Sequence, residues 1–442
     1  MVKLREFLFL IDRTEKVLPD KTYRQVGVRV WGKGAYERES ILGCNTKYKE
    51  LSKVLANDII VNKIWARNGS VAIVTSELDG CYCSSEFPLF VVDEKKARLG
   101  WVRWLIKTPW FWKQCLEKSG GTSGKNRITP NNFLEINVEL PPLNKQTEAF
   151  RRLDISAPTI SELGLINKET SKLIQDLRQS ILQKAVTGKL VPQDPSDKPA
   201  SELLKRMEGE KKRAILEKEI KKDIHLPPIS EEEIPFNLPE GWEWVRLGTI
   251  ASLITKGSSP RWQGVNYVEK NEGIFFITSE NVRSYKIDLT NEKYVEKKFN
   301  EIEPRSILKK GDFLMNIVGA SIGRTAIFNL NQENVNINQA VCLIRLFGDF
   351  LNKAYLLYFF NSDFCISNMY DKQVEMARPN LSMGNISKFL VPLPPFSEQQ
   401  RIAQKIDVLL KLCDELDEKI KENQSNAEFL METVLKEAFA CC

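Results

Sequence analysis

The sequence predicts an α+β protein made of two pseudo-symmetric globular domains, separated by two long antiparallel helices that form a coiled coil. The first observation is a repeat: "INVELPPLNKQTEAFRRLD", from residue 136, recurs as "FLVPLPPFSEQQRIAQKID", from residue 389, at an offset of 253. A second block, "NDIIVNKIWARNGSVAI" from residue 57, recurs as "GDFLMNIVGASIGRTAI" from residue 311, at an offset of 254. Two separated blocks at nearly one offset are hard to produce by chance, so we interpret the chain as a tandem duplication in which a helix follows each globular piece.

The globular pieces have a mostly strand-like pattern. Short apolar runs such as "DIIVNKI", "DFLMNIV" and "GIFFITS" are bounded by Gly, Asn and Asp, which is typical of strands. Helical patterns follow Leu99 and Leu351. We expect globular domains at 1–142 and 238–395, helical regions at 143–190 and 396–442, and a Pro-rich linker at 191–237 that holds a charged helix at about 199–222. The charges of that linker helix are typical of a solvated surface.

The distal helical region carries a sustained heptad stripe. Ser397 to Gln400 form a capping-box pattern, and apolar residues then recur at alternating spacings of four and three. In the central region Pro158 and Gly164 predict a kink or break in the first half of the helix. A run of about 44 residues would be roughly 66 Å long. The predicted helix–helix positions are Ile402, Ile406, Leu409, Leu416, Ile420 and Leu430, with Leu177 and Ile181 on the central helix.

Composition and motifs argue against an enzyme. The chain of 442 residues has one histidine, His225, and nine cysteines without a C-x-x-C pair, which removes most histidine chemistry and zinc ribbons. The segment Gly27–Gly34 fits G-x-x-x-x-G-K but lacks the Ser or Thr that a P-loop needs, and no G-x-G-x-x-G occurs. We therefore predict no catalytic, cofactor-binding or metal-binding residue. Without a membrane-length apolar run or a signal peptide, the expected address is cytoplasmic.

What remains is polar and basic loop material that suits a nucleic acid. Residues 1–140 hold 23 Lys and Arg against 16 Asp and Glu, and residues 236–395 hold 18 against 16. Arg suits guanine edges, Asn suits adenine edges, and both also bind phosphates. A modest positive charge is also typical of a solvated surface, so the argument depends on the set of loops. The predicted DNA-binding residues are Arg29, Trp31, Lys33, Lys63, Arg67, Asn68, Lys125, Arg127, Lys256, Ser258, Arg261, Asn281, Arg283, Arg324, Arg378 and Asn380.

Three phrases carry a family resemblance: "LPEGWEWVRLGTI", "ARPNLSMGNISKFLVPLPPFSEQQRIAQKID" and "LRQSILQKAVTGKLVPQDPSDKPASELLKRM". Together they resemble the DNA specificity subunit of type I restriction–modification systems. The resemblance implies two target-recognition domains, each reading one half of an asymmetric bipartite double-stranded DNA site, and a coiled coil that sets the half-site spacing. It also implies two methyltransferase subunits that use S-adenosylmethionine, restriction subunits that use ATP and Mg²⁺, and no membrane. The chain itself would do no chemistry and bind no cofactor.

Two features depart from the family pattern. The phrase at 238–250 has no full counterpart at the N-terminus, which reads "MVKLREFL", so the first domain is expected to lack this lead-in or to take it from elsewhere in the fold. Pro158 and Gly164 also make the central helix less regular than the distal one. Two other functions stay open on the residues alone: a coiled-coil adaptor that joins two protein-binding domains, and a nucleotide-dependent enzyme that uses the Gly27–Gly34 loop.

Overall fold

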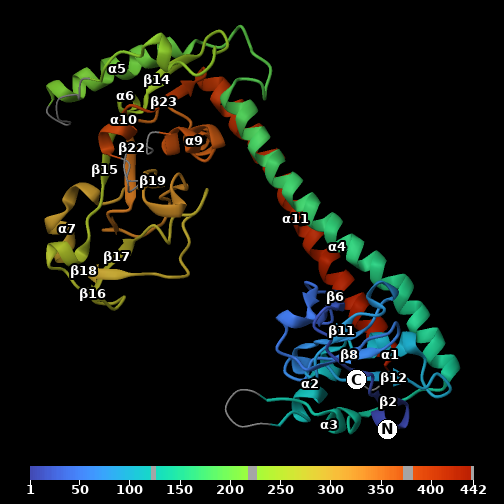
Figure 1. The fold of residues 1–442 in the computed structure, drawn as a ribbon. Coiled ribbons are helices and arrows are strands. Elements are labelled where there is room, and N and C mark those ends of the chain that lie inside the picture. Colours follow the sequence, from blue (N-terminus) through green and yellow to red (C-terminus); the bar gives the residue numbers. More distant parts are fainter. Residues whose placement is uncertain (121–125, 218–225, 372–381, 440–442) are drawn as a thin grey trace. The chain divides into compact units, whose positions relative to one another are not determined.

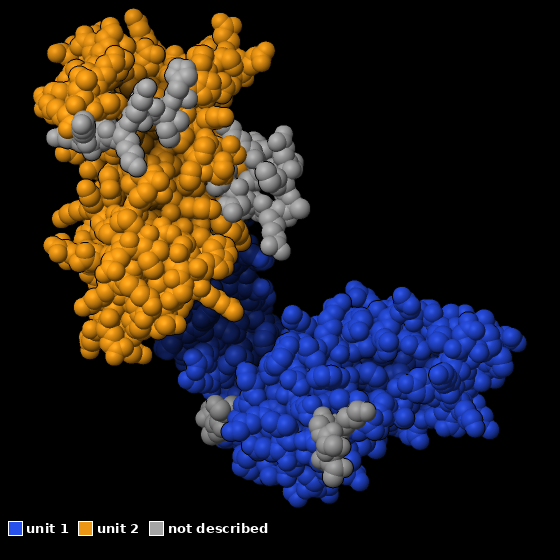
Figure 2. Space-filling view, turned by 90° about the vertical axis from the view of Figure 1, so that its left-hand side faces the viewer, with its two compact units in different colours: residues 1–169, 420–442 blue, residues 170–419 orange. Residues whose placement is uncertain are grey.

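The computed structural model describes residues 1–120, 126–217, 226–371 and 382–439, and the chain divides into two compact units (Figure 2). Unit 1 contains residues 1–169 and 420–442, and unit 2 contains residues 170–419. The two long helices, α4 (Leu143–Val186) and α11 (Phe396–Ala438), therefore each contribute one end to unit 1 and the other end to unit 2.

Unit 1 is built on small antiparallel sheets covered by short helices (Figure 1). The main sheet has the order β10-β9-β12-β2, and a second has the order β11-β8-β3. Helices α1 and α2 join the main sheet in one apolar core with the adjoining ends of α4 and α11. The elements are β1 (Val2–Lys3), β2 (Leu8–Ile11), β3 (Thr14–Lys16), β4 (Thr22–Tyr23), β5 (Val26–Val28), β6 (Ala35–Glu37), β7 (Ile41–Leu42), β8 (Glu50–Lys53), β9 (Ile59–Val61), β10 (Val71–Ile73), β11 (Tyr82–Cys83), β12 (Leu89–Val92), α1 (Leu99–Leu105), α2 (Pro109–Glu117), α3 (Pro130–Leu134) and β13 (Asn137–Val138).

Unit 2 repeats this plan with a different second sheet. Its main sheet has the order β15-β22-β19-β20, and a mixed sheet, β16-β18-β17-β21, contains one parallel pair. The elements are α5 (Ala200–Leu216), β14 (Glu243–Arg246), α6 (Leu247–Ile250), β15 (Ala251–Lys256), β16 (Tyr267–Val268), β17 (Gly273–Ile277), β18 (Tyr294–Glu296), α7 (Lys298–Ile302), β19 (Phe313–Asn316), β20 (Thr325–Ile327), β21 (Asn336–Ile337), β22 (Val341–Leu346), α8 (Lys353–Phe360), α9 (Asp363–Asp371), α10 (Met383–Ser387) and β23 (Leu390–Leu393).

The sequence repeat is also a repeat of strand register. Val61 on β9 lies opposite Val71 on β10, and in the second copy of the repeat Met315 on β19 lies opposite Thr325 on β20. The next strand keeps the correspondence, since Phe90 pairs with Ile59 and Ile344 pairs with Phe313. Helices α1 and α2 begin at positions of the repeat equivalent to the starts of α8 and α9. Because a shift of one residue would turn every side chain to the other face, equal register means equal cores, and the predicted duplication is confirmed.

The N-terminus supplies part of the lead-in that the sequence placed in doubt. Val2 on β1 pairs with Val138, and Val245 on β14 pairs with Val391. Two residues further along, a backbone amide makes the same bond in both units. The Leu4 amide donates to the carbonyl of Ile136 at 3.0 Å, and the Leu247 amide donates to the carbonyl of Phe389 at 2.8 Å. "VKL" of the first unit therefore takes the place of "VRL" in the second.

Helix α4 runs without a break from Leu143 to Val186, so the predicted break is wrong. Pro158 lies inside the helix and is exposed, where water can reach the carbonyl that loses its amide partner. One position further on, the Thr159 hydroxyl donates to the carbonyl of Ile155 at 3.2 Å. The helix therefore continues through the proline, because the proline lies on an exposed part of the helix where water can bond the freed carbonyl.

The two long helices lie side by side and antiparallel within each unit (Figure 1). In unit 1 Arg152 of α4 pairs with Glu437 of α11 at 3.6 Å, and in unit 2 Arg178 of α4 pairs with Asp414 and Asp417 of α11 at 2.7 and 2.9 Å. The predicted helix–helix residues divide into three groups by burial. Ile402, Ile406 and Ile181 are buried, Leu409 and Ile420 are partly buried, and Leu177, Leu416 and Leu430 are exposed.

The charged linker helix α5 is less solvated than its composition indicates. It buries Leu203 and Met207 against unit 2, and the Arg206 guanidinium lies over the ring of Phe350 at 5.7 Å. Amphipathic residues of this kind cover apolar surface with one face while their charges stay in water. The linker therefore forms part of unit 2.

Candidate nucleic-acid interface

The turn that follows β9 and β19 is built in the same way in both units. A glycine in the left-handed region closes each turn: Gly69 has φ +76° and Gly323 has φ +86°. A Cβ at Gly69 would lie 2.5 Å from the Trp112 ring of α2, and one at Gly323 would lie 2.8 Å from Ile366 of α9. Only glycine therefore fits, because both the backbone angle and the helix exclude a side chain. The turns present Lys63, Arg67 and Asn68 in unit 1 and Arg324 in unit 2.

In unit 1 the loop between β5 and β6 docks on this turn. The amide of Trp31 donates to the carbonyl of Asn68 at 2.6 Å, and the hydroxyl of Ser70 donates to the carbonyl of Val28 at 2.8 Å. The rings of Trp31 and Trp112 meet edge to face at 5.9 Å, and Trp31 itself has φ +59°. The "RVWGK" loop and the "KIWARN" turn, which are well separated in the sequence, thus form one surface.

That surface combines exposed aromatic rings with cations. The side chains of Trp31 and Trp65 are 55% and 47% exposed. Arg29 lies over the ring of Tyr36 at 4.7 Å, and Lys107 lies over the ring of Trp104 at 4.8 Å. Burial and the nearby Arg103 lower the pKa of Lys107. Sequence reasoning missed Lys107, which precedes α2. Its aliphatic stem lies beside Gly32 of the docked loop, while its ammonium lies over Trp104. No local signal at Lys107 could have found it, because its place depends on the docked loop.

In unit 2 a different loop, residues 278–291, occupies the corresponding place. The amide nitrogen of the buried Asn316 donates to the carbonyls of Ser279 and Val282 at 3.0 and 3.1 Å. The amide of Tyr285 donates to the carbonyl of Thr325 at 2.9 Å. The two units therefore share the turn and differ in the loop that docks on it.

Asn281 has a structural position in that loop. It is buried, its side-chain oxygen accepts from the amide of Thr278 at 2.9 Å, and its nitrogen donates to the carbonyls of Asp288 and Asn291. Its amide is fully used inside the protein, so we remove it from the predicted DNA-contacting set. Arg283 at the loop surface pairs with Asp288 at 3.3 Å, and hydrogen bonds from Thr290 together with this arginine lower the pKa of Asp288 to about 2.

The "TKGSSPRW" loop after β15 presents several exposed side chains in unit 2. Trp262 is 77% exposed, and Lys256 and Arg261 are also exposed. Ser258 is only partly exposed, and its hydroxyl accepts from Gln263 at 2.9 Å, while Gln263 also donates to Glu303 at 3.0 Å. The serine therefore shapes the loop, whereas the lysine, arginine and tryptophan face outward.

The remaining candidates lie elsewhere or outside the described residues. Lys33 is exposed beside Trp31, and exposed Arg127 lies 3.6 Å from Glu86. Lys125, Arg378 and Asn380 are outside the described residues.

A buried glutamine ties each globular piece to the helix that follows it. The side-chain oxygen of Gln146 accepts from the amide of Arg98 at 2.7 Å, and its nitrogen donates to the carbonyl of Pro141 at 2.7 Å. Gln399, at the equivalent position of the repeat, accepts from Asn352 and donates to Pro394, both at 2.9 Å. Because both amides are fully buried, each bond forms in a low-dielectric site where losing it is costly.

An aspartate two turns further along repeats the tie. Asp154 on α4 accepts from the indole of Trp104 at 2.7 Å, and Asp407 on α11 accepts from the hydroxyl of Tyr358. The donors occupy equivalent positions in α1 and α8. We call Gln146 with Asp154, and Gln399 with Asp407, the two helix clasps. They orient each globular piece on its own helix.

The described residues show little that could carry out a reaction. No cluster of His, Cys, Asp and Glu among them could hold a metal ion. Burial raises the pKa of the Cys83 thiol to about 12 and also raises those of Cys115, Cys342 and Cys365, so these thiols are poor nucleophiles. In the same part of the chain, every helix is too short or too polar to cross a bilayer.

Comparison with known proteins agrees with this geometry. Residues 239–423 match the family model described as the type I restriction modification DNA specificity domain. Over 366 residues the chain is 36% identical to the type I restriction enzyme EcoAI specificity subunit of Escherichia coli. The aligned stretch covers 72% of this chain and 60% of that protein. Residues 239–423 are therefore a domain of the type I restriction modification DNA specificity family, and the resemblance predicted from the sequence is confirmed for this part of the chain.

Solved structures share the fold over nearly the whole chain. A chain from the structure titled for complex assembly and conformational transition of the type I R-M system has a TM-score of 0.68 at 17% identity, covering 99% of this chain and 96% of that one. The HsdS subunit from Thermoanaerobacter tengcongensis has a TM-score of 0.62 at 19% identity, covering 99% and 95%. The predicted fold class is confirmed. The chain spans 60% of the EcoAI subunit and 43% of the EcoEI specificity subunit of Escherichia coli.

Proposed function

We propose that this chain is the DNA sequence-specificity subunit of a type I restriction–modification system. It binds an asymmetric bipartite double-stranded target, one half-site with each unit, and performs no chemistry itself. The observation that carries the proposal is the duplicated glycine-closed turn, on which a different loop docks in each unit. A shared platform with different reading loops suits two unlike half-sites, because phosphate contacts position a protein and base contacts specify the sequence.

In unit 1 the contacting residues proposed are Arg29, Trp31, Lys33, Lys63, Arg67, Asn68 and Arg127, together with Lys107. In unit 2 they are Lys256, Arg261, Arg283 and Arg324, with Ser258 shaping the loop. Exposed rings such as Trp31 and Trp262 offer stacking surface beside these cations.

The partners proposed are two methyltransferase subunits, which methylate adenine with S-adenosylmethionine, and restriction subunits that use ATP and Mg²⁺. The helix pair supports a protein partner because it exposes large apolar residues. In unit 2 these include Leu173, Leu177, Val408 and Leu412, and in unit 1 they include Ile155, Leu165 and Phe429. A cytoplasmic location follows from these partners.

The experiment is to map methylated adenines in host cells with and without this chain. We expect one bipartite motif to lose methylation when the chain is absent, and purified complex to bind that motif with an affinity that falls steeply as salt rises. Alanine variants of Arg261 and Arg67 should each relax one half-site. A chain that joins protein partners but shows no salt-dependent DNA binding would instead be a structural adaptor.

A further inference from the structure

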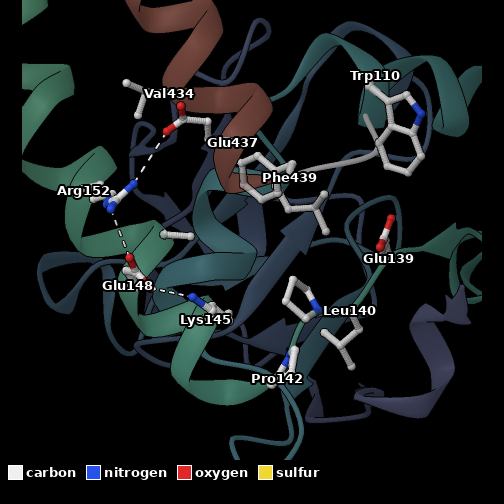
Figure 3. Close-up of a pocket in the computed structure, with 13 residues that line it drawn as sticks. Trp110, Glu139, Leu140, Pro142, Lys145, Glu148, Arg152, Val434, Glu437 and Phe439 are labelled. Atoms are coloured by element: carbon white, nitrogen blue, oxygen red, sulfur yellow. Dashed lines mark hydrogen bonds and ion pairs between the residues drawn. The ribbon is translucent and has the colours of Figure 1, made fainter.

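The face of unit 1 where helix α4 begins carries an open groove of about 430 Å³ (Figure 3). We call it the Lys145 groove, and its wall includes Trp110, Leu140, Pro142, Lys145, Glu148 and Arg152. One side of it is a chain of ion pairs, from Lys145 to Glu148 at 3.3 Å and from Glu148 to Arg152 at 3.1 Å (Figure 3). Its floor is apolar, with Leu140 and Phe439 facing Trp110.

The equivalent face of unit 2 is covered by the chain's own linker. Glu398, the counterpart of Lys145, accepts from the indole of Trp242 at 2.9 Å and from Gln193 at 2.8 Å. Arg401, the counterpart of Glu148, pairs with Asp197 at 2.6 Å. Proline-rich segments at 188–199 and 236–244, each of which contains a turn, thus lie over this face.

The aromatic wall of the face is covered in unit 2 as well. Phe364, the counterpart of Trp110, packs against the rings of Phe236 and Trp244 at 5.4 and 6.3 Å. Pro395, the counterpart of Pro142, is buried beneath Gly241.

The two faces differ in exposure as a result. Glu398 is 1% exposed in unit 2, whereas the side chains of Lys145 and Glu148 are 66% and 48% exposed in unit 1. Pro394 and Pro395 are buried, whereas Pro142 is exposed. One surface has been duplicated, and only the second copy is covered among the described residues.

The charges at two neighbouring positions of the groove wall are reversed relative to unit 2. Lys145 stands where unit 2 has Glu398, and Glu148 stands where it has Arg401. A segment like 188–199 from a second copy of this chain would bring Asp197 against Glu148, which is repulsive. Like charges held together are a common way to exclude a wrong partner. The groove therefore favours a polypeptide of the opposite charge order.

We propose that the Lys145 groove binds a proline-containing segment of a different polypeptide, one that places a carboxylate beside Lys145 and a cation beside Glu148. The segment takes the place that residues 188–199 take in unit 2. The inference goes beyond DNA recognition, because no predicted DNA-contacting residue lines the groove.

The test uses the full chain and two synthetic peptides. One has the sequence of residues 187–199, "TGKLVPQDPSDKP", and the other carries Gln193→Glu and Asp197→Lys, which reverse its charge order. We expect the charge-reversed peptide to bind at sub-millimolar concentration and about 10-fold more tightly than the native peptide, since it makes two ion pairs and removes the repulsion between Asp197 and Glu148. Hydrogen exchange should show protection of residues 140–152.

A charge-reversed protein completes the test. The double variant Lys145→Glu with Glu148→Arg should prefer the native peptide, while the matched control Glu94→Lys with Lys95→Glu, at an exposed site of unit 1, should leave the preference unchanged. The proposal would be overturned if neither peptide bound the wild-type chain, if both bound equally, or if hydrogen exchange protected residues outside 140–152. These three results are measured on the wild-type chain, so they do not depend on whether the double variant folds. Tighter binding of the native peptide would assign the groove to a second copy of this chain. DNA binding measured in parallel reports on the proposed function separately.

Discussion

At the scale of single residues, burial separates side chains that build the reading loops from those that face outward. Asn281 and Arg261 lie on neighbouring loops of unit 2, and both residue types suit base edges. Asn281 is buried with its amide bonded to three backbone groups, whereas Arg261 is exposed. Sequence alone cannot make this distinction, because the bonds of Asn281 span a loop whose path depends on Asn316.

These two residues give a paired prediction. Asn281→Ala should lower the free energy of unfolding by about 2–3 kcal/mol, because it leaves buried backbone groups without partners. Arg261→Ala should leave stability nearly unchanged and weaken binding of the complex to its target by about 1–3 kcal/mol. Urea unfolding and fluorescence anisotropy with target DNA measure the two effects. Equal losses of stability in the two variants would contradict a structural position for Asn281 and an outward-facing one for Arg261.

Another residue-scale prediction concerns the pairing of Glu233 with Arg246. Hydrogen bonds from the buried Arg246 lower the pKa of Glu233 from 4.5 to about 2. A carboxyl whose pKa is lower in the folded state stabilises the fold above its unfolded pKa, and this contribution is lost as pH falls through the folded pKa. Wild-type protein should therefore be more stable than Glu233→Gln at about pH 6, well above the unfolded pKa.

The difference between these two proteins should shrink between pH 4.5 and about 2, since protonation removes the same charge in the wild type. Urea unfolding at several pH values checks this, and the variant's own acid response serves as the baseline. A difference that stays constant down to the lowest pH would show that the carboxylate charge contributes nothing.

At the scale of elements, the helix clasps explain why the sequence repeat is strongest around the two Pro-Pro sequences. Gln146 and Gln399 each fix the first turn of a long helix to the loop before α1 or α8. The repeat therefore corresponds to the contact between a globular piece and the helix that follows it. The capping pattern and heptad spacing predicted the helices from sequence, but the clasps became visible only when the loop before α1 and the start of α4 were placed together.

The clasp predicts a change in spacing selectivity. Gln399→Leu should reduce the free energy of unfolding by about 1–3 kcal/mol and loosen unit 2's reading domain on α11, because two buried backbone groups lose their partner. Binding to targets whose half-sites are one base pair closer or further apart should then become more permissive. Competition binding with a spacer series measures the tolerance.

Gln400→Leu is the matched control, since the neighbouring Gln400 is exposed. It should keep wild-type stability and spacing selectivity. An equal broadening in both variants, or a stability loss without broadening, would reduce the clasp to an ordinary fold-stabilising contact.

At the scale of the whole molecule, the sequence predicted what is repeated better than what differs. The offsets of 253 and 254 foretold equal strand registers and equal helix starts. The offsets could not predict which loop docks on the turn. In unit 1 it is the β5–β6 loop, and in unit 2 it is the loop of residues 278–291. Docking depends on contacts between segments that are distant in the sequence. The proline at 158 misled for a related reason, since a local helix breaker is tolerated on an exposed part of a helix where water can bond the freed carbonyl.

The continuous helices α4 and α11 lead to the last prediction, that they measure the distance between half-sites. Insertion or deletion of four residues within 402–434 should shift spacer preference and leave the half-sites unchanged. The cleaner form inserts four residues in each helix, near 165 and 423, which adds about 6 Å, close to two base pairs of roughly 3.4 Å. Four residues turn a helix by roughly 40° beyond one full turn, so the apolar stripe stays nearly in phase.

Methylation mapping should show the same two half-sites with a longer spacer. The same insertion between Glu94 and Lys95 should change neither, and altered half-sites in the helix variant would contradict the measuring role.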